Sequence, residues 1–387
     1  MKIFILTTRF PYPLDKGDKL RIFNQIKILS KFHKVYLCSL NFYNNKVKKN
    51  YIELLENYCE EIHIINTSNF SVIKNILLSL FNKLPFQTIF FYNKKIKKLI
   101  HSLINKIKPD HIYCQLTRAG EYVKDVKINK TIDYMDTFSI GMKRIGKKSS
   151  FLKRIVYNIE YNRQRNYESK LFDYFDYHTI TSKEDKKYIH HKMNSKIKIV
   201  KNGIDANFFL KENKKKIFDI LFVGNMSYEP NIDAAIFLTT KIIPKIKIIF
   251  PNIKLLIAGT NPVKRIVQLK NDNIVVSGWM DDIRHAYNIS NIFIAPMRIG
   301  TGIQNKVLEA MAMKNACVTT KIVNLSIEAP HNAIKIGENS NELANHCINL
   351  LQDKKMKEKQ INEAYKYIKS EYNWEKTSTP LLNIFKN

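Results

Sequence analysis

At 387 residues the chain is too long for one ordinary hydrophobic core, which predicts two domains, and its 45% hydrophobic content suffices for globular packing. Its 64 basic and 34 acidic residues give a net charge of +30, which favours anionic partners, although a lysine-rich coding bias explains such a charge as well. The basic residues are spread along the chain and are not clustered with aromatic residues on one element, so nucleic acid is not an expected partner.

The five cysteines are scattered, and no two have the C-x-x-C spacing of a zinc or redox site. This pattern argues against a disulfide framework and indicates a reducing compartment such as the cytoplasm. The N-terminal run MKIFILTT lacks a small-residue cleavage site, so it predicts a buried first strand and not a signal peptide. Uninterrupted apolar runs stay below membrane-spanning length, which predicts a soluble or peripheral protein.

Short apolar strands alternate with helices along the whole sequence. In the first half the predicted strands are residues 2–7, 35–40, 111–115, 131–135 and 177–181, and a helix is predicted over 21–31. In the second half the predicted strands are 217–223, 254–258, 274–277, 291–295 and 316–319, with helices over 232–241 and 303–313. This alternation is typical of parallel sheets covered by helices on both faces. We therefore predict an α/β fold with two Rossmann-like domains, joined at residues 199–205, where Asn202-Gly203 favours a turn.

The segment from Ala295 to Ala312 carries the strongest chemical signal. It joins a strand to a helix through a loop with Gly300 and Gly302, and glycine lets a backbone approach a ligand closely. Amides at the start of a helix suit a phosphate, and Lys306 adds a positive charge one turn into this helix. Glu309 lies three residues later on the same face, where its carboxylate suits the hydroxyls of a ribose. These residues predict a nucleotide site; the alternative is an ordinary strand-loop-helix unit with a charged surface.

Ligands of doubly wound sheets bind beyond the carboxyl ends of the strands, so other loops there are candidates too. The loop after the first strand contains Gly17, and Gly224-Asn225 follows the strand over 217–223. Gly278-Trp279-Met280 follows a further strand, where Trp279 either presents a surface to a base or serves as a core or hinge aromatic. In the first half, the polar residues near strand ends are Gln115, Arg118, Asp133 and Asp136.

Taken together, these segments resemble the retaining glycosyltransferases of the GT-B fold, glycosyltransferase family 4. VKNGIDANFF at 200–209 is similar to the interdomain signature of that family, and FVGNMSYEPN at 222–231 is similar to the first strand and loop of its nucleotide domain. GTGIQNKVLEAMA at 300–312 is similar to the segment that holds the donor diphosphate and ribose. That segment and PYPLDKGDKLR at 11–21 are nearest to a subgroup from surface-polysaccharide assembly.

The resemblance covers nearly the whole chain and implies two Rossmann-like domains that face each other across a cleft. It implies an acceptor domain over residues 1–199, a donor domain over 200–371, and a C-terminal helix over 372–387 that packs back on the acceptor domain. It further implies retaining transfer of a sugar from a nucleotide sugar to a saccharide or lipid-linked saccharide, in O-antigen, capsule or exopolysaccharide biosynthesis. No cofactor and no metal are implied, and the expected location is the cytoplasm.

The resemblance also assigns roles to individual residues. Lys306 and Arg298 are expected to neutralise the donor diphosphate, and Asp136 is expected either to orient an acceptor hydroxyl or simply to cap a loop. The expected donor-binding residues are Gly17, Gly224, Asn225, Trp279, Met280, Gly300, Thr301, Gly302, Asn305 and Glu309.

Two departures from the family pattern limit what can be carried over. Thr301 stands at the position of the first of two family glutamates, which touches the donor sugar, so the identity of that sugar does not follow. Asn225 stands at the position of an arginine. Two alternatives stay open: a GT-B sugar-nucleotide epimerase or hydrolase, which needs no acceptor, and a non-catalytic basic protein that binds polyanions with a steep salt dependence.

Residues 70–108 mix apolar residues with lysines and contain no acidic residue. In a helix the apolar residues Ile96, Leu99, Ile100, Leu103, Ile104 and Ile107 form one stripe, flanked by Lys94, Lys95, Lys97, Lys98, Lys106 and Lys108. The pattern predicts docking on the anionic inner face of a membrane, with packing on the protein's own sheet as the alternative. A second long helix carries Glu160, Arg163, Arg165 and Glu168, which are expected to be paired surface charges.

Overall fold

The computed structural model describes residues 1–42, 47–67, 83–205, 209–210, 212 and 214–386. The chain divides into two compact units, one formed by Met1–Asn202 with Thr377–Asn387 and the other by Gly203–Lys376. Each unit contains one sheet in which all the described strand pairs are parallel. The predicted α/β fold with two Rossmann-like domains is therefore confirmed.

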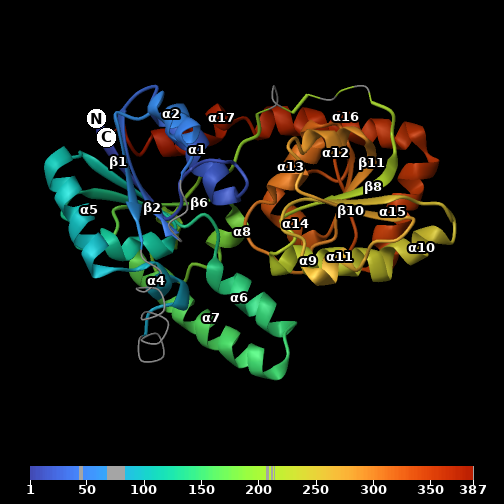
Figure 1. The fold of residues 1–387 in the computed structure, drawn as a ribbon, viewed down its shortest axis with the longest axis horizontal. Helices are drawn as coiled ribbons and strands as arrows, with labels where there is room; N and C mark the ends of the chain where they lie inside the picture. The colour runs from blue at the N-terminus through green and yellow to red at the C-terminus, as the bar shows by residue number, and fades with distance from the viewer. Residues whose placement is uncertain (43–46, 68–82, 206–208, 211, 213, 387) are drawn as a thin grey trace. The chain divides into compact units, whose positions relative to one another are not determined.

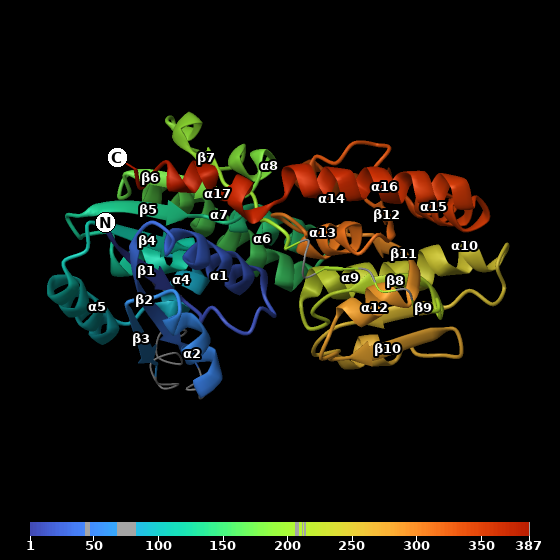
Figure 2. The same cartoon turned by 90° about the horizontal axis from the view of Figure 1, so that it is seen from above.

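The sheet of the first unit has the strand order β3-β2-β1-β4-β5-β6-β7, which can be followed in Figure 2. Its strands are β1 (Lys2–Thr7), β2 (Lys34–Asn41), β3 (Glu61–Asn66), β4 (His111–Gln115), β5 (Asn129–Asp133), β6 (Tyr177–Ile180) and β7 (Lys198–Ile199). The order reverses direction between β1 and β4, and such a switch point opens a crevice at the carboxyl ends of the strands. The loops that follow β1, β4 and β5 therefore form the functional edge of this unit.

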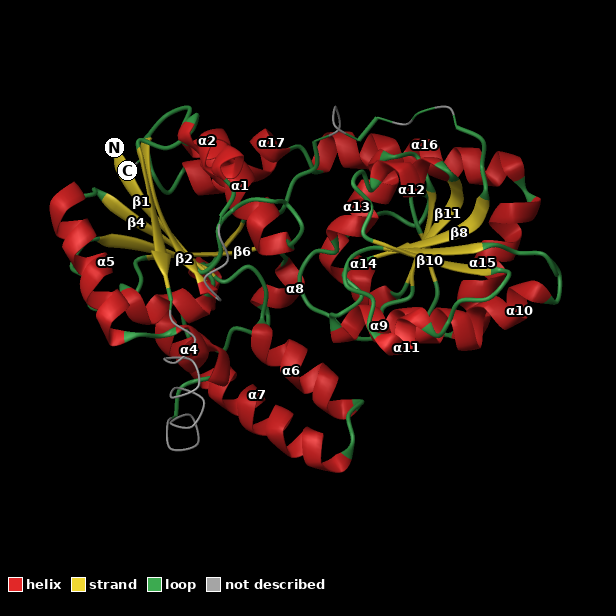
Figure 3. Ribbon diagram, viewed as in Figure 1, coloured by secondary structure: helices red, strands yellow, loops and turns green. Residues whose placement is uncertain are grey.

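The helices of the first unit cover both faces of its sheet (Figure 3). They are α1 (Gly17–Leu29), α2 (Lys49–Glu56), α4 (Phe86–Phe91), α5 (Lys94–Ile107), α6 (Phe138–Lys147), α7 (Phe151–Phe172), α8 (Lys183–Lys186) and α17 (Trp374–Leu382), the last from Thr377 onward. Because side chains alternate along a strand, β1 contributes Phe4 and Leu6 to a cluster with α5 and contributes Ile3 and Ile5 to a cluster with α1 and α17. The first unit thus has two core layers.

A buried ion pair joins α1 to β5. Arg21 and Asp133 are both fully buried, and Nε and Nη2 of Arg21 donate to the two carboxylate oxygens at 2.7 and 3.0 Å. Nη1 of Arg21 donates to the carbonyl of Val200 at 2.8 Å and to Oδ1 of Asn202 at 3.0 Å. The bidentate geometry and the additional acceptors satisfy a guanidinium that would otherwise be costly to bury. Asp133 therefore stabilises the packing of α1 on β5, and its buried carboxylate is not exposed to a substrate.

The sheet of the second unit has the strand order β10-β9-β8-β11-β12-β13. Its strands are β8 (Phe218–Val223), β9 (Leu255–Ala258), β10 (Ile274–Gly278), β11 (Ser290–Ala295), β12 (Ala316–Thr319) and β13 (Lys335–Ile336). Its helices are α9 (Glu229–Phe237), continued by a π-helical turn at Leu238–Ile242, then α10 (Ile243–Lys247), α11 (Lys264–Val267), α12 (Arg284–Asn288), α13 (Asn305–Ala312), α14 (Lys321–Ile327), α15 (Ser340–Gln352) and α16 (Lys354–Glu371). β8 and β11 lie side by side at the switch point, so the ends of these two strands position the loops that matter most.

Several sequence predictions are corrected. The helix predicted from residue 21 begins at Gly17, so this glycine starts a helix and does not lie within a loop. Glu160 and Glu168 are buried and not paired surface charges: Glu160 accepts from the backbone amide of Phe86 at 2.8 Å, and Glu168 accepts from Ser139. Hydrogen bonds from neighbouring donors offset the cost of burying these carboxyl groups.

The apolar stripe of α5 is part of the core. Ile96, Ile100, Ile104 and Ile107 are buried against the sheet, and only Leu99 of the predicted stripe is largely exposed. In this conformation the stripe is not available for insertion into a membrane, which favours the alternative that the sequence left open. Residues 70–82 of the same segment lie outside the described residues. Among the described helices none is both long and apolar enough to cross a membrane.

Candidate functional site

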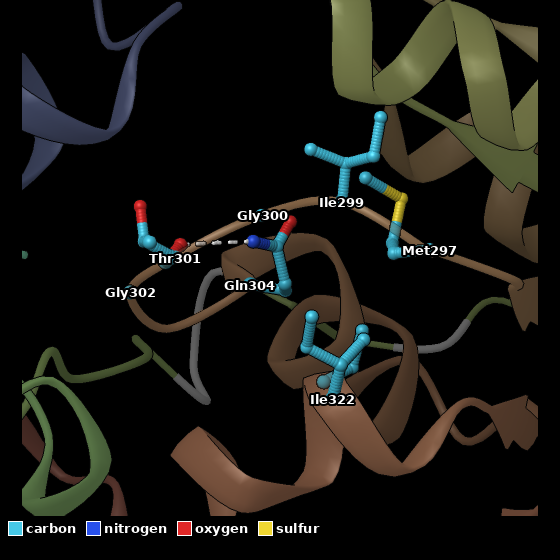
Figure 4. Close-up of a pocket in the computed structure, with 8 residues that line it drawn as sticks. Met297, Ile299, Gly300, Thr301, Gly302, Gln304 and Ile322 are labelled. Carbon is cyan, nitrogen blue, oxygen red and sulfur yellow. Dashed lines mark hydrogen bonds between the residues drawn. The ribbon is translucent and has the colours of Figure 1, made fainter. Parts of the chain in front are cut away.

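The loop between β11 and α13 turns sharply on two glycines. Gly300 has φ 150° and Gly302 has φ 70°, both in a region that residues with a Cβ rarely adopt. The side-chain amide of Gln304 donates to the carbonyl of Thr301 at 3.3 Å, which folds the loop back onto the start of the helix. The loop and α14 line a pocket (Figure 4), formed by Met297, Ile299, Gly300, Thr301, Gly302, Gln304, Ile322 and Val323.

Lys306 lies in the first turn of α13, directly after this loop. Its Nζ donates to Oδ1 of Asn231 at 2.5 Å and lies 4.9 Å from the centre of the Phe222 ring and 3.8 Å from Sδ of Met297. Burial lowers the pKa of Lys306 to about 7, and the nearby carboxylate of Glu309 opposes that shift. An anionic phosphate close to Nζ would favour the ammonium form again, so this lysine is suited to respond to a charged ligand.

Asn231 holds the Lys306 amine in place. Its Nδ2 donates to the backbone carbonyl of Asn225 at 2.9 Å, which fixes the orientation of Oδ1 toward Lys306. Gly224 leaves room for this side chain, because a Cβ at position 224 would lie 2.8 Å from Cγ of Asn231. The side chain of Asn225 accepts from the amide and hydroxyl of Ser227, so it stabilises the turn of its own loop. Gly224 and Asn225 thus support Lys306 through Asn231.

Glu309 lies one turn beyond Lys306 on the same helix. Its Oε2 accepts from the hydroxyl of the buried Tyr287 at 2.9 Å, and no described residue is recorded as a donor to Oε1. Burial raises the pKa of Glu309, while the Tyr287 hydrogen bond and Lys306 oppose the shift. One oxygen is therefore held by the protein and the other remains available to a ligand hydroxyl.

Arg298 lies in the same loop but is engaged by α9. Its Nε and Nη2 donate to the two oxygens of Asp233 at 3.1 and 2.6 Å, and its guanidinium lies 4.2 Å from the centre of the Phe237 ring. The ion pair is partly exposed, so exchange of Asp233 for an anionic ligand would cost little. The expected role of Arg298 at a diphosphate stays a prediction.

Trp279 and Met280 follow β10 at the edge of the second sheet. Trp279 is 60% exposed, and its Nε1 donates to Oδ1 of Asp281 at 3.1 Å. It is therefore not a core aromatic, and much of its ring is accessible for stacking. Met280 packs against the core of the unit beneath it. The structure records no contact of either residue with Lys306 or Glu309, and their role at a base stays a prediction.

Of the residues expected to bind the donor or to act in catalysis, Gly17 and Asp136 belong to the first unit and the others belong to the second. Gly17 begins α1, and the next residue, Asp18, accepts from Arg9 at 2.7 Å and from Arg118 at 3.2 Å. The side-chain amide of Gln115 donates to the carbonyl of Asp18 at 2.8 Å. Gln115 and Arg118 therefore hold the start of α1 in place at the carboxyl edge of the sheet.

Asp136 follows β5 at the same edge. Its backbone amide donates to the carbonyl of Tyr134 at 2.9 Å, and the preceding Met135 has φ 61°. This tight turn fits the interpretation of Asp136 as a loop residue, and a role toward an acceptor stays a prediction.

The structure adds three residues that the sequence did not single out: Phe222, Asn231 and Tyr287. Phe222 and Asn231 lie within a motif noted in the sequence, but only the structure shows that both contact Lys306. Asn231 lies 75 residues before Lys306 in the chain. No sequence signal marks Tyr287, because its contact with Glu309 depends on the packing of α12 against α13.

The chain was compared with protein families and with known proteins. Residues 217–353 match the model of a family described as glycosyl transferases group 1. A Klebsiella pneumoniae protein, described as an uncharacterized 44.6 kDa protein in the cps region, is 26% identical to this chain over an alignment of 417 residues. The alignment covers 100% of this chain and 99% of the relative.

Solved structures resemble the whole chain. Sucrose-phosphate synthase from Thermosynechococcus elongatus matches with a TM-score of 0.75 at 11% identity, covering 100% of this chain and 98% of that one. Anabaena HepE in complex with UDP-glucose matches with a TM-score of 0.66 at 13% identity, covering 100% and 99%. The chain has the GT-B fold. Within this GT-B chain, Phe222, Asn231, Tyr287, Lys306 and Glu309 all fall inside the segment that matches the glycosyl transferase model.

Proposed function

We propose that the protein is a retaining glycosyltransferase that moves a sugar from a nucleoside-diphosphate sugar to a saccharide or a lipid-linked saccharide. The observation that carries the proposal is the pairing of Lys306 and Glu309 on α13, directly after the Gly300–Gly302 loop and at the carboxyl edge of the sheet. One residue supplies a cation for a diphosphate, and the other supplies a carboxylate oxygen for a ribose hydroxyl. The match of residues 217–353 to group 1 glycosyl transferases supports this assignment.

The chemistry follows from where charge develops. When the bond between the sugar and the diphosphate breaks, negative charge accumulates on the departing phosphate oxygen. A lysine whose charge is weakly solvated stabilises that oxygen more strongly than a lysine in bulk water. The departing phosphate oxygen takes the proton of the acceptor hydroxyl, so neither a protein nucleophile nor a metal ion has a required step. The acceptor then replaces the diphosphate on the same face of the sugar.

Further residues complete the proposed donor site. The glycine loop lets the backbone, with Thr301 and Asn305, approach the diphosphate closely. Arg298 releases Asp233 and adds a second cation when the diphosphate is bound. The exposed ring of Trp279 stacks on the base. Asp136, on the first unit, orients the acceptor hydroxyl.

The comparisons also support a class of substrate. The HepE structure contains UDP-glucose, and the K. pneumoniae relative lies in a cps region. We therefore place the reaction in the assembly of a surface polysaccharide, on the cytoplasmic side of the membrane, with a saccharide or a lipid-linked saccharide as the acceptor.

The test begins with thermal unfolding of the full chain against a panel of nucleotide sugars, because a ligand that binds only the folded state raises Tm. The nucleotide sugar that stabilises the protein is then incubated with lipid-linked saccharides, with and without EDTA, and the anomeric configuration of the product is determined by NMR. Transfer with retention in the presence of EDTA is the expected result.

The other outcomes identify the alternatives. Release of nucleoside diphosphate or inversion of a sugar centre without any acceptor would identify a hydrolase or an epimerase. Binding of RNA with a steep salt dependence, without turnover of any nucleotide sugar, would identify a polyanion-binding protein. The Lys306→Met variant is the control for transfer by this site, since it removes the proposed cation and keeps the apolar stem.

A further inference from the structure

The hairpin formed by α6 and α7 exposes a row of large apolar side chains. Phe151, Leu152, Ile155, Val156 and Ile159 have exposed fractions between 43% and 76%. They occur at positions i, i+1, i+4, i+5 and i+8 of α7, which places them on one face of the helix. Figure 1 shows the hairpin extending away from the sheet of its own unit. A contiguous apolar face of this kind is unusual on a soluble protein and indicates an interaction surface.

A different face of α7 attaches the hairpin to the first unit. Glu168 accepts from the hydroxyl of Ser139 at 2.7 Å and from its amide at 3.1 Å, and Glu160 accepts from the amide of Phe86 at 2.8 Å. The two helices also pack closely at the tip, because a Cβ at Gly146 would lie 3.0 Å from Cβ of Tyr157. The exposed stripe is therefore not needed to hold the hairpin in place.

All the charged residues in the segment that carries the stripe are basic. Residues 137–159 contain no acidic residue and six basic ones, namely Lys143, Arg144, Lys147, Lys148, Lys153 and Arg154. At about 100° per residue, Lys153 and Arg154 fall on opposite sides of the stripe. The next carboxylate along the chain, Glu160, is buried and faces the first unit. The tip of the hairpin thus joins an apolar face to a positive rim without carboxylates of its own.

We propose that this tip, residues 143–159, docks on an anionic lipid bilayer. The apolar stripe enters the boundary between headgroups and acyl chains, and the basic rim contacts lipid phosphates. A nucleic acid would use the basic residues but would leave Leu152, Ile155 and Val156 without a partner, so the combination favours lipid. The inference rests on the proposed function in one respect: a lipid-linked acceptor would be presented at the surface of such a bilayer.

The same unit supplies a matched control. The buried stripe of α5 leaves Lys94, Lys95, Lys98 and Lys106 exposed on its outer face. Replacing these four lysines with Gln removes as much charge as replacing Lys147, Lys148, Lys153 and Arg154 with Gln, but it leaves the hairpin unchanged. The pair of quadruple variants therefore separates docking by the hairpin tip from a general attraction between a basic protein and an anionic surface.

The experiment is flotation of the full chain with vesicles of phosphatidylcholine alone or mixed with phosphatidylglycerol, at low and high ionic strength. We expect the wild type to float only with the anionic vesicles and to be released by salt. The hairpin quadruple variant and the Phe151→Ser/Leu152→Ser double variant should each lower the vesicle affinity by about tenfold or more. The α5 variant should lower it by less than about twofold, and unchanged Tm values show that all variants are folded.

A depth measurement tests insertion directly. The five native cysteines are all buried, so Leu152→Cys introduces one accessible site for an environment-sensitive dye. We expect a blue shift of its emission on anionic vesicles and none on neutral ones. Equal flotation on both lipids, absence of flotation, or a loss in the α5 variant as large as in the hairpin variant would each overturn the proposal. Flotation needs no nucleotide sugar, so these outcomes are independent of whether the proposed transferase activity is found.

Discussion

Nζ of Lys306 donates to Oδ1 of Asn231 at 2.5 Å, and this bond joins the first turn of α13 to the first turn of α9. The two helices follow β11 and β8, the neighbouring strands at the switch point of the second sheet. The amine is thereby fixed at the functional edge before any ligand arrives. Catalysis by a preorganised cation predicts effects on turnover that exceed the effects on binding.

Lys306→Met should lower kcat by roughly 10²-fold or more, because the cation acts on charge that develops in the transition state. The change retains an unbranched apolar side chain against Phe222 and Met297, so Tm should change little. Steady-state kinetics with a fixed acceptor measure the effect, with the exposed Lys355→Met as the matched control. A rise in KM at constant kcat would instead show that Lys306 only binds the donor.

Glu309→Gln should weaken donor binding at least tenfold, since a hydrogen bond to a carboxylate contributes about 1.5–3 kcal/mol. Calorimetric titration with the nucleotide sugar measures the change. Tyr287→Phe keeps the carboxylate and removes only the bond that orients it, so its loss should be smaller. The assignment of Glu309 to the ribose fails if the Gln variant binds the donor as tightly as the wild type.

Donor affinity should decrease as pH rises above 7. The pKa of Lys306 in the free protein is lowered to about 7 by burial, and a bound diphosphate raises it. Between these two values binding takes up a proton, so the dissociation constant increases with pH across that window. Calorimetry in buffers of different ionisation enthalpy measures the proton uptake directly. In Lys306→Met the uptake should vanish; uptake that persists in this variant would assign it to another group.

Glu168→Gln should stabilise the protein most at the alkaline end of its stable range. Burial raises the pKa of Glu168 from 4.5 to about 8, and hydrogen bonds from Ser139 and Gln164 only partly oppose the shift. Between pH 4.5 and 8 the folded state keeps a proton that the unfolded state loses, so this group's contribution to stability falls as pH rises through that window. Gln has no such proton, so the Tm difference between variant and wild type should grow from pH 5 to pH 8. A difference independent of pH would show that Glu168 is already ionised in the folded protein.

Strands with continuous apolar runs were predictable from the sequence, and β1 and β4 have the bounds that periodicity indicated. The edge strand β3 was not predictable, because EIHIIN is only half-buried from Glu61 to Ile65 and His63 interrupts its apolar residues. In helix α7 the sequence predicted the helix but not which of its charged residues are buried. Its charges have helical spacing, but only the positions of Ser139 and the amide of Phe86 reveal that Glu160 and Glu168 face inward.

The candidate site divides in the same way. The part from Gly300 to Glu309 is contiguous, so residue types and spacing indicate its chemistry. Its supporting residues are distant in sequence: Asn231 lies 75 residues before Lys306, and Tyr287 lies 22 residues before Glu309. Such contacts depend on which helices the sheet brings together, and a single sequence does not show which helices will be neighbours.

In the first unit, the core layer between the sheet, α1 and α17 is built from both ends of the chain, and this has a consequence for biosynthesis. Leu381, Ile384 and Phe385 pack with Ile3 and Ile5 of β1, yet residues 203–376 of the second unit lie between them in the chain. During translation the ribosome therefore delivers the entire second unit before the first unit can complete this core layer. Until then the apolar side chains that Leu381, Ile384 and Phe385 will cover stay exposed, and such surface makes a nascent chain prone to aggregation.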